Sequence, residues 1–311
     1  MRKTILIVTG TLIALAISLL VGPSGLPDNP NVVRLRLIRT ALAFIAGMSL
    51  SVNGAALQSL FGNPLVDPHI IGISGGAALG FVIATLIGMP FSWAAAVAVM
   101  GGWLTTAFVY FISVENGYVS RSRLLLGGIS TGTFASSLVM ALLAVKGESA
   151  LYAIRFLWGY VGVVMTQKQL CTYGLSSLVI IAASVRMWLS SRELDAIYLG
   201  DSEALAIGVD IERLKKRVFL LASLSTGVLV AMVGIIGFIG LIVPHMARKL
   251  LRTGENLRVI PASAVLGGVF AVTADTVART LFPVELPLGV ITSLVGVPIF
   301  IYLIKAELNG A

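Results

Sequence analysis

Charged residues are scarce in this chain. Only 12% of its 311 residues are Asp, Glu, Lys or Arg, whereas 57% are hydrophobic. Soluble domains are about 25% charged and about 45–50% apolar. The mean hydropathy of +0.99 therefore excludes an ordinary soluble domain, because this much apolar surface needs lipid around it.

Metal-ligating side chains are also few. The chain has one cysteine, Cys171, and two histidines, His69 and His245. One cysteine excludes a disulfide framework or a Cys-based metal site within the chain, and two histidines are too few for a multi-histidine centre. We therefore expect this chain to hold no metal and no haem, and we interpret both histidines as structural.

Other signatures are missing too. No P-loop of the form G-x-x-x-x-G-K-[ST] occurs, so any ATP and Mg²⁺ must be bound by another chain. No nucleophile–base constellation or metal-ligand set supports a membrane enzyme. The net charge of +8 comes without a basic stripe carrying interleaved aromatics, so it indicates membrane orientation and not nucleic-acid binding.

Long apolar runs dominate what is present. They do not alternate in polarity, as barrel strands would, so the expected class is an all-α polytopic membrane protein forming one transmembrane domain over 1–311. The predicted spans are 4–22, 40–60, 70–88, 92–113, 123–145, 168–190, 217–234, 237–251, 259–281 and 286–305. Two of them, 70–88 and 237–251, are short or broken by glycine, so nine or ten spans are expected. The first is interpreted as a retained span and not a signal peptide, because no convincing cleavage site follows it.

Most Lys and Arg residues fall in segments that are cytoplasmic if both termini are cytoplasmic, which is the orientation expected in an inner membrane. Arg34, Arg36 and Arg39 then lie outside, against the rule. Two hypotheses explain Arg36 and Arg39. They anchor the chain to lipid headgroups, or they dock an acidic partner through forked, permanently charged guanidinium groups.

The longest polar segment is 191–217. Its spaced apolar residues predict two short amphipathic helices with a break at Gly208, capped by Asp201 or Ser202 and by Asp210. From the pattern alone, the segment is either a solvated loop or a docking element for a cytosolic partner.

Several motifs occur in a fixed order along the chain. They read RLIRT at 36–40, GAALQSLFGNPLVDP at 54–68, SRLLLGG at 122–128, LG at 199–200, GFIGLIVPHMAR at 237–248, ADTVAR at 274–279 and ELPLGV at 285–290. This ordered set resembles the permease family of ABC importers for iron-siderophores, haem and cobalamin, over roughly residues 34–305. The family commonly has proline where Ile38 stands.

The resemblance implies ten helices per subunit and a homodimer with the substrate path at its interface. It also implies two cytosolic ATPase subunits and a periplasmic or lipid-anchored solute-binding protein. Arg36 and Arg39 are then expected to dock the binding protein. The residues expected to contact the ATPase are Leu199, Gly200, Asp201, Ala204, Leu205 and Gly208. The substrate stays open among siderophores, haem, cobalamin and oxyanions such as molybdate.

Asp275 lies within an apolar segment, where an acid is a functional candidate by default. Arg279, one turn later, is its predicted ion-pair partner. A proton relay at Asp275 is the alternative, and it would suit a proton- or sodium-coupled secondary transporter. The prolines of 63–68 indicate a structural turn, with a gate as the alternative, and spans 40–60 and 123–145, including Asn53 and Ser136, are candidates for the path lining.

Overall fold

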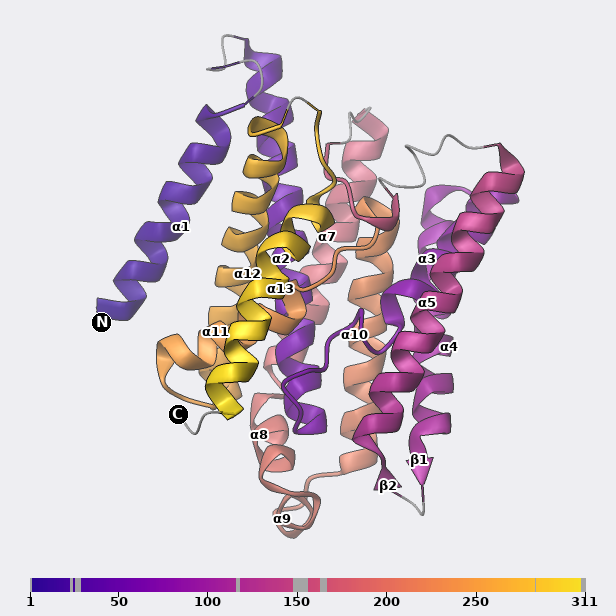
Figure 1. Cartoon of the computed structure of the whole chain (residues 1–311), viewed down its shortest axis with the longest axis vertical. Coiled ribbons are helices and arrows are strands. Elements are labelled where there is room, and N and C mark those ends of the chain that lie inside the picture. The colour runs from indigo at the N-terminus through magenta and orange to yellow at the C-terminus, as the bar shows by residue number, and fades with distance from the viewer. Residues whose placement is uncertain are drawn as a thin grey trace.

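The computed structural model describes residues 2–22, 25, 29–115, 118–147, 156–162, 167–282 and 284–308. Ten long or medium helices run roughly side by side, and two short ones protrude beyond their ends (Figure 1). The ten are α1 Arg2–Leu20, α2 Pro30–Phe61, α3 Ile73–Leu86, α4 Phe91–Ser113, α5 Arg121–Lys146, α7 Gln167–Trp188, α10 Ile211–Val233, α11 Ile239–Leu251, α12 Asn256–Thr280 and α13 Leu288–Leu308.

The protruding pair comprises α8, Ser191–Leu199, and α9, Asp201–Ala206. A two-residue antiparallel ladder of β1, Val114–Glu115, and β2, Tyr118–Val119, lies at the same end of the molecule (Figure 1). Both chain ends also lie in the half of the molecule that carries α8 and α9 (Figure 1). The fold is therefore all-α, as predicted, with one minimal hairpin between α4 and α5.

Each predicted span coincides with a helix. Among the described residues, six helices are long and apolar enough to cross a membrane, and shorter apolar helices cover Thr9–Leu20, Ile73–Leu86 and Leu288–Tyr302. The predicted short segment 237–251 is the 13-residue helix α11, which contains Pro244. The largest difference is in α2, which begins ten residues before its predicted start at 40 and so carries Arg34, Arg36 and Arg39 on the helix itself.

Local signals explain where α2 starts and stops. The Asn29 side chain accepts a hydrogen bond from the Asn31 N–H at 2.9 Å, and Pro30 occupies the first turn, where its missing N–H costs nothing. At the other end Gly62 adopts a left-handed conformation, with φ of 54°, and closes the helix.

The centre of the subunit is the contact of α2 with α12 and α11. The helices touch backbone to backbone, because a Cβ atom on Gly47 would overlap the carbonyl of Gly267, and one on Gly54 would overlap that of Gly240. Small residues at such crossings give close packing in lipid, where apolar contact alone brings no advantage over lipid tails. Helix α2 is consequently the most buried of the long apolar helices.

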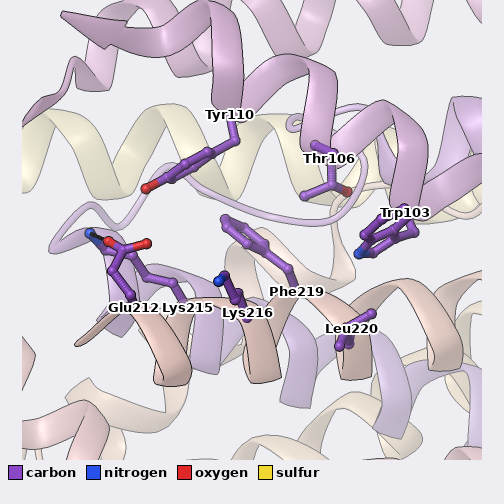
Figure 2. Close-up of a pocket in the computed structure, with 9 residues that line it drawn as sticks. Trp103, Thr106, Tyr110, Glu212, Lys215, Lys216, Phe219 and Leu220 are labelled. Carbon is purple, nitrogen blue, oxygen red and sulfur yellow. Dashed lines mark hydrogen bonds and ion pairs between the residues drawn. The ribbon is translucent and has the colours of Figure 1, made fainter. Parts of the chain in front are cut away.

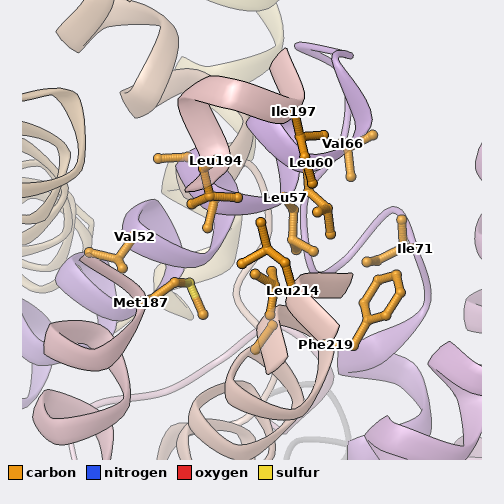
Figure 3. Close-up of a cluster of buried hydrophobic side chains, with 14 of the residues drawn as sticks. Val52, Leu57, Leu60, Val66, Ile71, Met187, Leu194, Ile197, Leu214 and Phe219 are labelled. Atoms are coloured by element: carbon orange, nitrogen blue, oxygen red, sulfur yellow. The ribbon is translucent and has the colours of Figure 1, made fainter. Parts of the chain in front are cut away.

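Apolar cores lie on both sides of this axis. One joins α2 and α12 to α7, α10 and α13, and another joins α3, α4 and α5 to α10. A third surrounds the end of α2, where Leu57 and Leu60 meet Leu194 and Ile197 of α8 and Leu214 of α10 (Figure 3). The third core attaches the protruding helices to the bundle.

Candidate functional site

Helices α8 and α9 form a protrusion whose inner side is firmly anchored. Leu194 and Ile197 of α8 and Ala204 of α9 are buried in the core around Leu57 (Figure 3). A hydrogen-bonded ion pair of 2.6 Å between Arg217 Nη1 and Glu193 Oε2 ties α8 to α10. The indole N–H of Trp188, just before α8, donates to the Leu257 carbonyl at 3.0 Å. The protrusion is therefore firmly attached to this end of the helix bundle.

The outer side of the protrusion is apolar and exposed. Tyr198, Leu205 and Ile207 have 60%, 62% and 72% of their surface exposed. Tyr198 lines a pocket with His245 and Arg248 of α11, so we call Leu205 and Ile207 alone the α8–α9 patch. They stand among charged neighbours such as Glu203, whose own backbone N–H and the Ser202 hydroxyl hold the pKa of its carboxyl below its usual range. Exposed apolar side chains ringed by polar ones are typical of a protein-binding surface.

Glycine shapes both ends of α9. Gly200, with φ of 147°, separates α8 from α9, and Gly208, with φ of 83°, separates α9 from α10. The predicted break at Gly208 is confirmed between α9 and the helix that Asp210 caps, although that helix, α10, is long, and the second break at Gly200 was not predicted. The predicted cap is present at Asp210, which accepts from the Arg213 N–H at 2.9 Å, whereas the N-cap of α9 is Gly200.

The residues expected to contact the ATPase differ in their exposure. Leu205 and Gly208 are exposed, whereas Ala204 is buried and Gly200 half-buried. The side chains of Leu199 and Asp201 lie outside those that the structure describes. The structure therefore brings Leu205 and Gly208 to one surface and places Ala204 in the supporting core.

Sequence reasoning missed a polar network beneath the protrusion. The backbone N–H and side-chain Nδ2 of Asn256 donate to Asp195 Oδ1 at 2.9 and 2.7 Å, and Ser59 Oγ donates to Asn256 Oδ1 at 2.8 Å. Next to Ser59, the Gln58 Oε1 accepts from Arg248 Nη1 at 2.6 Å. We call these five residues the α2–α8 network, because they connect α8 to α2, α11 and α12. The available signal was the polar pair Gln58-Ser59 within an apolar helix.

A second charged group lies at the opposite end of α2. Arg39 makes a forked contact with Asp275, with Nε 2.8 Å from Oδ2 and Nη2 2.7 Å from Oδ1. Arg39 also pairs with Glu285, whose Oε2 accepts from the Tyr160 hydroxyl at 2.6 Å. Arg279 Nε is 3.7 Å from Asp275 Oδ2. We call these five residues the α2–α12 charge cluster.

The cluster revises the predicted pairing. The predicted ion pair of Asp275 with Arg279 is present at 3.7 Å, but the shorter contacts of Asp275 are with Arg39, 236 positions away, which was not predicted. The Arg279 guanidinium also donates to the Ser18 carbonyl and, at 3.0 Å, to the Ser18 hydroxyl. Two cations balance two anions, and the Asp275 side chain is only 2% exposed. This arrangement fits a structural ion cluster better than a proton relay open to water.

Arg36 has a different environment from the one expected. Its guanidinium donates to the carbonyls of Leu19 and Leu20 at 3.1 and 2.9 Å and to that of Gly25 at 2.8 Å. The residue is buried and closes the end of α1 against α2. Docking of a binding protein by Arg36 and Arg39 stays a prediction, although both side chains are engaged within this subunit. Arg34 is exposed and donates to Gln167 at 2.9 Å.

The remaining candidates have local roles. Asn63 and Asp67 accept from the N–H groups of Leu65 and Ile70 at 2.9 and 2.7 Å, which is the turn stabilisation expected for this segment. Asn53 is buried and donates to Ser225 and Thr226. Span 40–60 is mostly buried inside the subunit, so the prediction that this span lines the transport path is wrong for this subunit. Within the described part of the chain no cluster of three or more His, Cys, Asp or Glu could hold a metal.

Comparison with known proteins agrees with this architecture. The model of the FecCD transport family matches residues 5–306. The chain is 36% identical over 285 residues to a cobalamin import system permease protein of Halobacterium salinarum, covering 90% of this chain and 75% of that protein. It is 38% identical over 286 residues to a hemin transport system permease protein of Yersinia pestis, covering 88% and 83%.

A solved structure has the same fold. It is described as an inward-facing conformation of a metal-chelate type ABC transporter, and it superposes with a TM-score of 0.83 at 28% identity over 98% of each chain. The matched residues span nearly every helix described above. The chain therefore belongs to the FecCD transport family and is a membrane-spanning permease subunit of an ABC importer, with no catalytic role of its own.

Proposed function

We propose that two copies of this chain form a homodimeric permease that carries a metal-chelate-type nutrient into the cytoplasm. The names of its relatives support this substrate class, because they include cobalamin, hemin and siderophore permeases. Two ATPase subunits, which bind ATP and Mg²⁺, grip the α8–α9 protrusions. Closure of the ATPases shifts the dimer between outward- and inward-open states. The whole chain acts as one transport domain.

The single observation that carries this proposal is the α8–α9 patch. A side chain as apolar as Leu205 gains nothing from exposure to water, and its position on a charged protrusion outside the bundle excludes lipid as its main contact. A pocket on a partner would bury it, as interface anchors are buried. Since the protrusion is fixed to α2 by the α2–α8 network, movement of such a partner reaches the centre of the subunit.

The path between the two copies is proposed to run along α5. This helix is poorly buried within the subunit and exposes Leu126, Ile129 and Phe134 together with weakly polar Thr133, whereas Ser136 is half-buried. A wall of this kind offers no deep binding well, so a large chelate passes without being trapped. Selection among substrates then rests with a solute-binding protein outside the membrane.

Orientation follows from the same proposal. The ATPase-binding protrusion is cytoplasmic, and both termini lie in that half of the molecule (Figure 1). The α2–α12 charge cluster then lies toward the outer surface of the inner membrane, near the face where the binding protein docks. Arg39 is 15% exposed in its side chain and contributes to that face while paired with Asp275.

The test is recovery of the ATPase with the purified permease. Leu205→Glu places a charge in the apolar pocket of the partner, so the co-purified P-loop ATPase should fall at least about tenfold, as expected for a lost interface anchor of about 2 kcal/mol or more. Val145→Glu is the matched control, because Val145 is 89% exposed at the opposite end of the bundle. Equal ATPase recovery with Leu205→Glu and wild type would remove the coupling assignment.

The energy source and the substrate need a separate measurement. Proteoliposomes containing the permease, its ATPase and its binding protein should take up one of cobalamin, haem or a ferric siderophore only when ATP is supplied. Uptake that persists without the ATPase and collapses with a proton uncoupler would instead identify a secondary transporter. Uptake of none of the three with ATP present would reject the metal-chelate class.

A further inference from the structure

A groove of about 280 Å³ runs between α4 and α10, on a part of the subunit that no proposed partner uses (Figure 2). Its walls are mainly apolar and aromatic, formed by Trp103 and Tyr110 of α4 and by Phe219 and Leu220 of α10. Thr106 adds no free polar group, because its hydroxyl donates to the Gly102 carbonyl of its own helix at 2.8 Å. The groove is therefore suited to a hydrocarbon chain.

The two ends of the groove differ in polarity. Glu212 and Lys215 lie with the Tyr110 hydroxyl at one end, Lys216 lies beside Phe219 between the ends, and Trp103 and Leu220 lie at the other end (Figure 2). The polar end belongs to the start of α10 and the last turns of α4, which are at the level of the β1–β2 ladder. The apolar end extends toward the middle of both helices. This polarity matches a phospholipid with its headgroup at the cytoplasmic surface.

The charge at the polar end selects the headgroup. Lys215 Nζ pairs with Glu212 Oε1 at 3.1 Å, so these two charges balance. Lys216 is exposed and leaves the groove mouth with one net positive charge. Both lysine stems reach along the apolar wall, which places their ammonium groups at headgroup depth. An anionic headgroup is thus favoured over a zwitterionic one.

The groove opens toward lipid and not toward the inside of the subunit. Helix α4 is one of the less buried long helices and exposes Trp103 and Ala107 along this side. Tryptophan and tyrosine are enriched where a helix meets the headgroup region. Basic pockets between helices on the cytoplasmic side are typical binding sites for anionic lipid headgroups.

We propose that this groove is a specific site for an anionic phospholipid. One acyl chain lies between Trp103 and Leu220 over the edge of Phe219, and the phosphate contacts Lys216 and the hydroxyl of Tyr110. A lipid in this position bridges α4 and α10 beside the segment that joins α9 to α10. It would therefore hold the start of α10 against α4 independently of any transported substrate.

The experiment uses the full chain in nanodiscs containing equal amounts of phosphatidylglycerol and phosphatidylcholine with identical acyl chains. Native mass spectrometry after release counts the lipids that each subunit retains. Wild type should retain phosphatidylglycerol at least about fivefold over phosphatidylcholine, the ratio that corresponds to about 1 kcal/mol for one basic residue near an anionic headgroup. Lys215→Gln with Lys216→Gln should abolish this preference. Lys249→Gln, an exposed lysine at the same end on α11, should keep it.

A second variant tests the hydrocarbon part without changing charge. Leu220→Trp fills the apolar end and should reduce retention of both lipids, whereas Leu178→Trp, on the exposed face of α7, should not. No preference for phosphatidylglycerol in wild type, or an unchanged preference in the double lysine variant, would overturn the proposal. Loss of dimer in Leu220→Trp with unchanged lipid retention would assign the groove to a second copy of the chain and would also overturn it.

Discussion

The α2–α12 charge cluster and the α8–α9 patch lie at opposite ends of the same bundle and differ in whether their side chains find partners within the subunit. In the cluster, Arg39, Asp275 and Glu285 pair with one another inside the subunit. In the patch, Leu205 and Ile207 are left with most of their surface exposed. The cluster is complete within one chain, whereas the patch needs a partner. Stability should therefore depend on the first, and assembly on the second.

The largest expected effect comes from breaking the cluster. Asp275→Ala leaves the half-buried Arg39 without its main counter-ion, and removal of one partner of a buried pair costs about 3–5 kcal/mol, so the loss should lie near the lower end of that range. The variant should show a markedly lower unfolding temperature in detergent, measured by size-exclusion or intrinsic fluorescence. The paired change Arg39→Met with Asp275→Leu removes both charges and should recover most of the loss. An unchanged unfolding temperature in Asp275→Ala would show that the cluster is not structural.

A smaller effect is expected in the α2–α8 network. Asn256→Ala removes the side-chain donor Nδ2 from Asp195 and the acceptor of Ser59, whereas the backbone N–H of residue 256 is kept, so the change should cost about 1–3 kcal/mol. Because the network joins α8 to α2, the variant should still bind the ATPase but transport less per ATP hydrolysed. The measurement is the ratio of uptake to hydrolysis in proteoliposomes. A normal ratio would show that movement reaches the bundle by another route.

Gly208, which lies beside the α8–α9 patch, should affect assembly more strongly than stability. A side chain at Gly208 has open space around it within the chain, but its φ of 83° disfavours any residue except glycine. Gly208→Trp should therefore destabilise the subunit by about 1–3 kcal/mol while largely abolishing ATPase recovery. Gly208→Ala has the same backbone strain without the bulk, so it is the control. Equal recovery of ATPase by both variants would argue against close approach of a partner here.

The smallest effect is expected for an exposed ion pair. Arg258 Nε and Glu255 Oε2 are 3.1 Å apart, yet both side chains are more than half exposed. Water and salt screen such pairs, so Arg258→Gln should change the free energy of unfolding by about 1 kcal/mol or less. A loss as large as that of Asp275→Ala would remove the distinction between buried and exposed pairs on which this comparison depends.

Local signals in the sequence were sufficient for much of the fold. Long apolar runs marked each helix, and Asp210 before Ile211 marked the start of α10. The start of α2 was misplaced because Arg34 to Arg39 look like a loop in isolation. In the structure those arginines are tolerated on a helix because carbonyls at the end of α1 and the carboxylates of Asp275 and Glu285 surround them.

Local sequence signals could not predict the pairs that form between segments far apart in the chain. The spacing of four residues favoured Arg279 as the partner of Asp275, but the packing of α2 on α12 brings Arg39 closer. The α2–α8 network was missed for the same reason, since Asn256 and Asp195 carry no local pattern that links them. The resemblance to a family supplied the coupling residues, but only the fold separates exposed Leu205 from buried Ala204.

Helix α2 carries residues of both the α2–α12 charge cluster and the α2–α8 network. Arg39 and Gln58 are nineteen positions apart on α2, which amounts to about 28 Å along the axis. Between these two residues, glycines of α2 pack directly against the backbones of α12 and α11, with no long side chains between the helices. If the helix tilts as a rigid body, a tilt of about ten degrees at one end displaces the other end by about 5 Å, which is close to one helical turn.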